Sequence, residues 1–138
     1  MEKEALKTLE FGRITELLQQ EAGSVLGKEL AAALLPSSDF EEVQERMLQT
    51  AEAARVYQTS SPPLGGIRDI RQLIKKVKLG AILDAAEISD VMNTMYAMRN
   101  IKRFFKELEI EAPILKGWAQ SIEILGQLER NIENTIDE

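Results

Sequence analysis

Eight cationic side chains have the types and spacing in this sequence that best suit the binding of an anionic partner. They form two groups, one after a proline- and glycine-rich break and one late in a long apolar-striped segment: Arg68, Arg71, Lys75, Lys76, Arg99, Lys102, Arg103 and Lys106. Guanidinium and ammonium groups at helical spacing can bind nucleic-acid phosphates or an acidic protein surface. No aromatic platform accompanies them, so we expect any nucleic-acid binding to involve the backbone rather than the bases.

The alternative for the same cations is a set of solvated helix faces with internal ion pairs, which are common and individually weak. The charge pattern by itself favours this alternative. The second group also lies near the C-terminal end of a predicted helix, where cations stabilise the helix dipole. Part of this group therefore has a purely structural explanation.

Several kinds of chemistry are excluded by composition. The chain has no cysteine and no histidine, which removes disulfides, zinc sites of the usual kind and Ser-His or Cys-His catalysis. Carboxylate pairs such as Glu41/Glu45 and Asp84/Glu87 fall at predicted helix starts, where capping explains them better than acid–base catalysis. Gly65-Gly66 is not followed by the Lys-Ser/Thr of a phosphate-binding loop. We therefore predict no catalytic residue, no cofactor site and no metal site in this chain.

The charges divide the 138 residues into three blocks. Residues 1–60 carry 6 Lys/Arg and 11 Asp/Glu, residues 61–108 carry 9 and 5, and residues 109–138 carry 2 and 7. The net charges of −5, +4 and −5 give the overall −6. A basic middle in an acidic chain favours a polyanionic partner or an acidic surface. No apolar run reaches the ~20 residues of a membrane span and no signal-peptide core is present, so we expect a cytoplasmic protein without membrane contact.

Apolar residues at helical spacing predict helices in the first block over 3–10, 13–21 and about 25–34. Phe11-Gly12 is expected to bend the chain, and Pro36 to stop the third helix. Ser38 with Glu41 predicts a capping box for a long helix over 39–58. That helix carries an apolar stripe that ends in small residues, which would let another helix approach closely: Phe40, Val43, Met47, Ala51 and Ala54.

The break at 61–69 separates these acidic helices from the basic helices predicted at 70–108. Asp69 is expected to cap a helix over 70–78, which Gly80 ends. Asp84 and Glu87 form a second capping signal, which opens a helix over 84–108. The methionines of that helix at positions 92, 95 and 98 could form a soft binding groove, but core packing is the favoured interpretation.

C-terminal helices are predicted over 113–138, one near 114–121 with Trp118 packed in the core and one from about Ile124. The apolar pattern of the last helix has no stop signal at Glu138, so we expect a fragment of something longer. Strand-like alternation is absent. The sequence as a whole predicts a single all-α domain, an irregular multi-helix bundle.

The central stretch Pro62-Pro63-Leu64-Gly65-Gly66-Ile67-Arg68-Asp69-Ile70 closely resembles a segment near the N-terminus of a bacterial MutS family. This is the second type, the MutS-like endonucleases that lack the mismatch-recognition domain. Weaker agreement extends along the chain and departs from the family pattern at Gln72, Ala81 and Asp84. The matching stretches are Thr8-Leu9-Glu10-Phe11, Leu26-Gly27-Lys28-Glu29-Leu30, Leu79-Gly80-Ala81-Ile82-Leu83, Arg99-Asn100-Ile101-Lys102-Arg103-Phe104 and the last residues, 132–137.

The resemblance implies that the chain is the N-terminal core or lever region of such a protein. The parent would be a homodimeric, DNA-binding ATPase with nuclease activity that restrains recombination or splits collided ribosomes. Its ATP and Mg²⁺ site and its nuclease domain would lie outside this chain, whose own role would be to transmit the nucleotide state to the clamp. Two alternatives remain open: a stand-alone helical module that binds nucleic acid, and a dimerisation module that uses the Met-rich or C-terminal helices.

Overall fold

The computed structural model describes residues 3–136, and this range contains helices and no strand. The all-α prediction is therefore confirmed. Residues 1–2 and residues 137–138, the end of the predicted C-terminal helices, lie outside the described residues. Among the helices described, none is long and apolar enough to cross a lipid bilayer. In chain order they are α1 (Lys3–Thr8), α2 (Phe11–Glu21), α3 (Val25–Ala32), α4 (Phe40–Thr59), α5 (Arg71–Lys78), α6 (Ala85–Glu107), α7 (Pro113–Ser121) and α8 (Gly126–Ile136).

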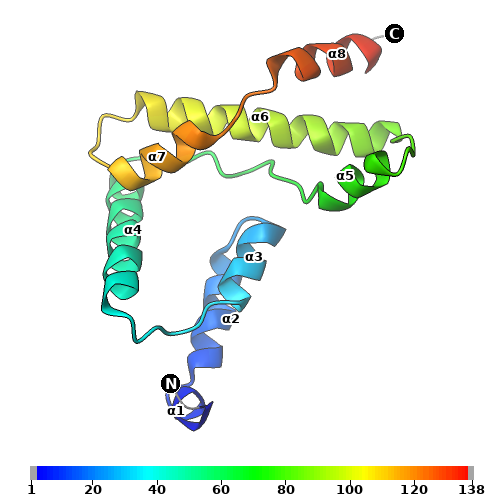
Figure 1. The fold of residues 1–138 in the computed structure, drawn as a ribbon. Helices are drawn as coiled ribbons and strands as arrows, with labels where there is room; N and C mark the ends of the chain where they lie inside the picture. The colour runs from blue at the N-terminus through cyan, green and yellow to red at the C-terminus, as the bar shows by residue number, and fades with distance from the viewer. Residues whose placement is uncertain (1–2, 137–138) are drawn as a thin grey trace.

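The helices are arranged openly rather than as a closed bundle (Figure 1). α7 packs on the C-terminal part of α6, and α8 also packs against α6. α4 lies with one end next to α7, near the C-terminal end of α6, and extends away from α6. α2 and α3 pack on each other as a separate pair, which lies next to α4 and below α6 in this view. The predicted break at 61–69 is an extended segment that leads from α4 back along α6 to α5.

The main apolar core lies where α4, α6 and α7 meet. Its buried members are Val56, Phe105, Ala112 and Ala119. Partly buried apolar residues of α6, of α7 and of the turn after α6 surround this cluster: Ile101, Phe104, Leu108 and Leu115. The core is small because only these three helices converge on it.

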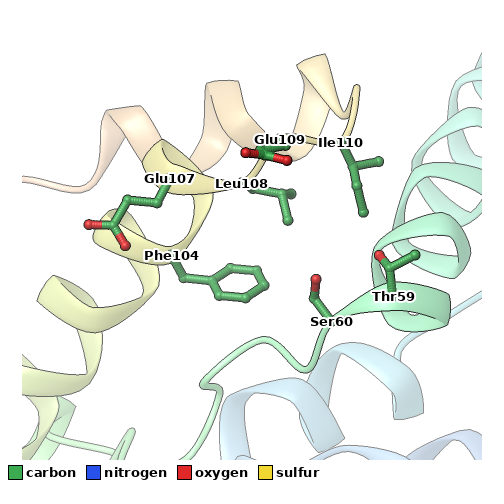
Figure 2. A pocket seen from close by; sticks show the side chains of 7 residues that line it. All are labelled: Thr59, Ser60, Phe104, Glu107, Leu108, Glu109 and Ile110. Atoms are coloured by element: carbon green, nitrogen blue, oxygen red, sulfur yellow. The ribbon is translucent and has the colours of Figure 1, made fainter.

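A shallow pocket of about 380 Å³ adjoins this core, between the end of α4 and the turn that follows α6 (Figure 2). Its walls are Thr59, Ser60, Phe104, Glu107, Leu108, Glu109 and Ile110. The carboxylate of Glu107 points away from the phenyl ring of Phe104, and the carboxylates of Glu107 and Glu109 do not converge on one point (Figure 2). This pocket therefore lacks the paired carboxylates that acid–base chemistry needs.

The middle of α6 forms a second buried region. Met92 and Met95 are buried, which confirms the core interpretation for these two methionines. Gly66 in the break has a left-handed φ of 86°, and a Cβ placed on it would lie 3.5 Å from the Cβ of Ala97. The second glycine of the break thus serves a turn that only glycine adopts easily, at a close approach to α6.

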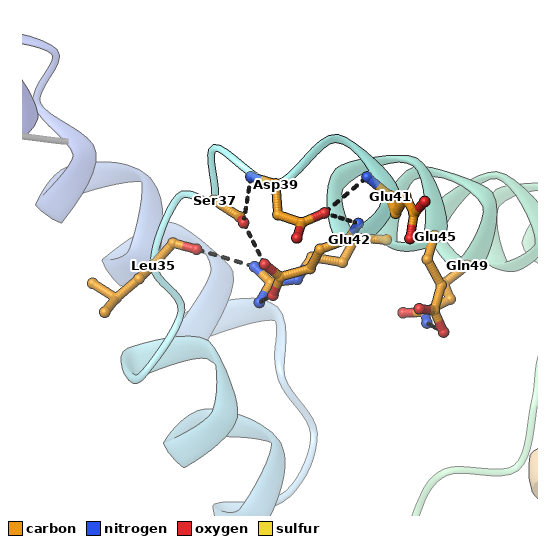
Figure 3. A network of polar contacts seen from close by, with 8 residues as sticks. Leu35, Ser37, Asp39, Glu41, Glu42, Glu45 and Gln49 are labelled. Atoms are coloured by element: carbon orange, nitrogen blue, oxygen red, sulfur yellow. Dashed lines mark hydrogen bonds and ion pairs between the residues drawn. The ribbon is translucent and has the colours of Figure 1, made fainter.

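The capping predictions hold in part. Asp84 and Glu87 form the predicted capping box at the start of α6, and Gly80 ends α5 with a left-handed φ of 84°. At α4, however, the prediction of Ser38 is wrong, because the cap is Asp39, whose Oδ1 accepts hydrogen bonds from the N–H groups of Glu41 and Glu42 (Figure 3). The serine and the aspartate are adjacent, and the carboxylate can satisfy two of the free N–H groups at once.

Three further local predictions are wrong. The bend after the first helix lies at Glu10, which has a φ of 52°, so α2 begins at Phe11 rather than after it. α5 begins with Ile70 at the cap position, although Asp69 Oδ1 still accepts from the Arg71 N–H at 3.2 Å. Trp118 is 54% exposed rather than packed, because α7 turns Ala119 toward the core.

α7 is held at both ends by charges from other helices. At its start, the buried carboxylate of Glu52 accepts hydrogen bonds from the N–H groups of Ile114 and Leu115 at 3.0 Å. Beyond its end, Lys102 Nζ donates to the carbonyl oxygens of Gln120 and Ile122 at 3.0 and 2.6 Å. An anion at the N-terminus and a cation at the C-terminus both complement the helix dipole.

The molecule exposes far more surface than its mass requires. The accessible surface is 10485 Å², whereas a compact monomer of 15.5 kDa would expose about 7,200 Å². The excess of about 3,300 Å² is the size of an obligate subunit interface. The predicted stripe of α4 belongs to this surface, since Phe40 is 72% and Met47 67% exposed.

Candidate nucleic-acid interface

The first group of predicted cations gathers around α5. Its position depends on the buried Thr94 of α6, whose Oγ1 accepts a hydrogen bond from the Arg68 N–H at 3.0 Å and donates one to the Asp90 carbonyl at 2.9 Å. The Arg68 side chain then lies with its Nε 3.7 Å from Asp90 Oδ1. The break and α6 are thus joined at the point where the basic segment begins.

Arg71 is engaged with two carboxylates from different parts of the chain. Its Nη2 lies 2.7 Å from Glu29 Oε1 in α3 and 2.7 Å from Asp69 Oδ2, and its Nε donates to Asp69 Oδ1 at 2.8 Å. These hydrogen bonds lower the pKa of Asp69 to about 2 and the pKa of Glu29 below its ordinary value of 4.5. The same bonds raise the pKa of Arg71. This guanidinium is therefore already neutralised by the protein itself.

Lys76 is neutralised in the same way, while Lys75 is not. Lys76 Nζ donates to both carboxylate oxygens of Glu87, at 2.7 and 2.6 Å. This hydrogen bond, together with one from the Asp84 N–H, lowers the pKa of Glu87. In residues 3–136, Lys75 forms neither a hydrogen bond nor an ion pair, although its charge contributes to the lowered pKa of Asp69, and its side chain is exposed.

The second group lies in the last third of α6, and its first member serves the contact with α8. Arg99 forms an ion pair with Glu129, a carboxylate that is 2% exposed. The guanidinium also stacks 5.6 Å from the ring centroid of Tyr96, whose hydroxyl donates to Glu133 of α8. Arg99 is a structural partner of a buried anion, and such a pair is costly to break.

The remaining members of the second group differ in their engagement. Lys102 is committed to the end of α7, as described above. Arg103 donates to the side-chain oxygen of Asn100 at 2.9 Å and has no carboxylate partner within the described range. Lys106 is exposed, and the structure records no polar contact for it across residues 3–136. Arg103 and Lys106 therefore remain available to an external anion.

The predicted cations do not form one continuous basic face. The first group lies beside α5 and the N-terminal half of α6, and the second occupies the C-terminal third of α6 (Figure 1). The whole of α6, with its 23 residues, is about 34 Å long. Within residues 3–136, three of the eight cations have no hydrogen bond or ion pair with a carboxylate or a backbone carbonyl: Lys75, Arg103 and Lys106. The geometry supports internal ion pairing more strongly than a phosphate-binding surface.

Two buried carboxylates were missed by the sequence interpretation. Glu52 is 4% and Glu129 2% exposed, yet both were included only in counts of charge. A signal was present for Glu52, because it lies four residues before Val56, an apolar residue outside the predicted stripe of α4. No group of three or more acidic residues within the described structure is arranged to hold a metal ion.

Comparison with known proteins agrees with the resemblance described above. No protein-family model matches the chain. The chain is 41% identical over 140 aligned residues to Endonuclease MutS2 of Bacillus cereus (strain B4264), and 41% identical to the proteins of the same name from Bacillus thuringiensis (strain Al Hakam) and Bacillus anthracis. Each alignment covers 99% of this chain but 18% of the relative. Over nearly its whole length, the chain is thus homologous to a region that makes up less than a fifth of a MutS2 endonuclease.

Proposed function

We propose that this chain is a non-catalytic helical scaffold, equivalent to the N-terminal core and lever region of a MutS-like, DNA-binding ATPase with endonuclease activity. The similarity to proteins named as endonucleases supports the placement in such a protein. The limited share of those relatives that the chain spans, 18%, supports a role as one part of a larger machine.

The observation that carries this proposal is the uncovered apolar surface. Large apolar side chains on α2, α3 and α4 stand in solvent, among them Leu30, which is 75% exposed. Soluble proteins rarely leave continuous apolar patches open unless another body covers them. A scaffold that receives the remaining domains of the same polypeptide would present such a surface.

The proposal assigns the chemistry to those other domains. ATP and Mg²⁺ would be bound there, and the nuclease would also lie there, so the scaffold would carry no catalytic residue. Its partners would be the other domains, a second copy of the whole protein, and DNA or the ribosome. The whole protein would act in the cytoplasm, in the suppression of recombination or in ribosome rescue.

The polar ties between helices support a mechanical role. The carboxylate of Glu52 joins α4 to the start of α7, and the ammonium group of Lys102 joins α6 to the end of α7. Lys116 of α7 also donates to the carbonyl oxygen of Leu108, just beyond α6, at 2.7 Å. A displacement of α4 would therefore be passed to α6 through α7, as a lever requires.

Two experiments test the proposal. The purified 138-residue chain should hydrolyse no ATP and cut no DNA above the level of a mock purification. A chimera in which this chain replaces the matching region of the Bacillus cereus endonuclease should retain the activities of that protein. Turnover that follows the isolated chain would overturn the non-catalytic assignment.

A matched pair of variants in the chimera tests whether the apolar surface is covered. Leu18→Asp changes a residue of the uncovered surface and should lower both activities and the thermal stability of the chimera. Gln20→Asp, two residues further along the same helix and exposed, should change neither. Equal effects of the two substitutions, or an inactive chimera that is folded, would contradict the scaffold role.

A further inference from the structure

An apolar cleft lies between α5, α6 and the start of α8. Its volume is about 270 Å³. Eight of its eleven lining residues are apolar, and they come from three sides, among them Ile70 and Ile74 beside α5, Met95 and Met98 on α6, and Leu125 and Leu128 beside α8. A void of about 150 Å³ with apolar walls can bind benzene, so this cleft has room for a bicyclic ring.

The α6 wall of the cleft is formed in part by two of the three methionines that the sequence places at helical spacing. Met95 is 7% exposed and Met98 is partly buried, whereas Met92 does not line the cleft. Methionine sulfur makes favourable contacts with aromatic rings, and the unbranched side chain adapts to their shape. The soft binding groove that the sequence left as an alternative is therefore compatible with core packing at these two positions.

The polar groups of the cleft differ in their engagement. The hydroxyl of Thr94 accepts from the Arg68 N–H, and the carboxylate of Glu129 is paired with Arg99. Glu123, in the connection between α7 and α8, is exposed and forms neither a hydrogen bond nor an ion pair within residues 3–136. No lysine or arginine lines the cleft. The charge that a ligand would meet there is thus a single uncommitted carboxylate.

We infer that this cleft binds a small aromatic amine, with the ring against the methionines of α6 and Leu128 and the ammonium group beside the Glu123 carboxylate. Removal of the ring from water supplies most of the affinity. The exposed ion pair adds little affinity but selects a cationic ligand over an anionic one. Because the ligand contacts α5, α6 and α8 together, it also holds α8 in place. This site is independent of the scaffold function proposed above.

Methionine methyl NMR of the purified chain tests the site with three probes that share one ring: tryptamine, indole and indole-3-acetate. Tryptamine should shift the methyl signals of Met95 and Met98 but not that of Met47, which lies on α4 and is 67% exposed. Tryptamine should also bind more tightly than indole-3-acetate. Glu123→Gln should lower the affinity for tryptamine about two- to fivefold and leave that for indole unchanged. Glu21→Gln, which removes an exposed carboxylate on α2, should alter neither affinity.

A matched pair of substitutions tests whether the ring enters the cleft. Val91→Phe places a ring in the cleft and should abolish binding of tryptamine and indole, with the helical circular dichroism retained. Val77→Phe, at an exposed position of α5 outside the lining, should leave binding intact. If Val91→Phe does not fold, the comparison of Glu123→Gln with wild type still decides. Equal shifts of Met47 and Met95, no shift at millimolar tryptamine, or a tryptamine affinity that Glu123→Gln leaves unchanged would overturn the aromatic-amine site.

Discussion

The carboxylate of Glu52 accepts hydrogen bonds from the backbone N–H of Ile114, at 3.2 and 3.0 Å for its two oxygens, across 62 residues of sequence. A carboxylate on α4 thus completes the first turn of α7, which no side chain of its own caps. Since α7 in turn packs on α6, this bond couples the two longest helices of the chain. Its loss should therefore affect more than one local turn.

The substitution Glu52→Ala should lower the free energy of unfolding by about 2 kcal/mol, because it leaves the partly buried N–H groups of Ile114 and Leu115 without their acceptor. Urea denaturation followed by circular dichroism measures this change. The fluorescence of Trp118, which lies on α7, reports whether that helix is released first. Glu45→Ala, an exposed glutamate on the same helix, should stay within about 0.5 kcal/mol of wild type, and an equally stable Glu52→Ala would refute the capping role.

Lys102→Met should destabilise the fold by about 1 kcal/mol, because the cation and its hydrogen bonds at the end of α7 are lost. Hydrogen exchange of the last turn of α7 should become faster in this variant. Lys106→Met, one helical turn further along α6, is the matched control and should leave that exchange unchanged. The same rate for Lys102→Met and wild type would show that Lys102 does not stabilise α7.

A lower pH should weaken the ion pair between Glu29 of α3 and Arg71 of α5. A carboxyl group whose pKa is lowered in the folded state contributes stability above its unfolded pKa and loses it as the pH falls through the folded pKa. For Asp69 this contribution is complete above its ordinary pKa of 3.8 and is lost as the pH falls toward about 2, and the lowered pKa of Glu29 gives a contribution of the same sign, which is lost as the pH falls below 4.5. An NMR titration should give a pKa of about 2 for Asp69, which rises toward 3.8 in Arg71→Gln. A carboxyl that titrates near 3.8 in both proteins would exclude the hydrogen-bonded pair in solution.

Any binding of DNA by the isolated chain should depend only modestly on salt. Eight phosphate contacts would give a slope of log K against log salt of about −7, whereas the three cations left free would give about −3 at most. Substituting Lys75, Arg103 and Lys106 by Gln should remove this dependence without lowering stability. Arg99→Gln should instead destabilise the contact between α6 and α8, because Glu129 would remain buried without its partner. A measured slope near −7 would instead support phosphate contacts by all eight cations.

The sequence by itself determined the helices and most of their ends. Apolar spacing, the Asp84–Glu87 capping box and Gly80 depend on residues within three or four positions of one another, so they can be interpreted without any knowledge of the fold. The resemblance in the central break also depends on neighbouring residues. Errors occurred where two adjacent residues could both act, as with Ser38 and Asp39 at α4.

Only the tertiary structure decided which apolar faces are covered and which charges are paired. Helical periodicity shows that α4 has an apolar stripe, but the coverage of Met47 depends on where α2 and α3 lie. The ion pair of Glu29 with Arg71 and the bond of Glu52 to Ile114 join residues 42 and 62 positions apart. Such partners are set by packing between helices, which no local pattern specifies, and for this reason the sequence could not show that five of the eight predicted cations have a carboxylate or carbonyl partner within the chain.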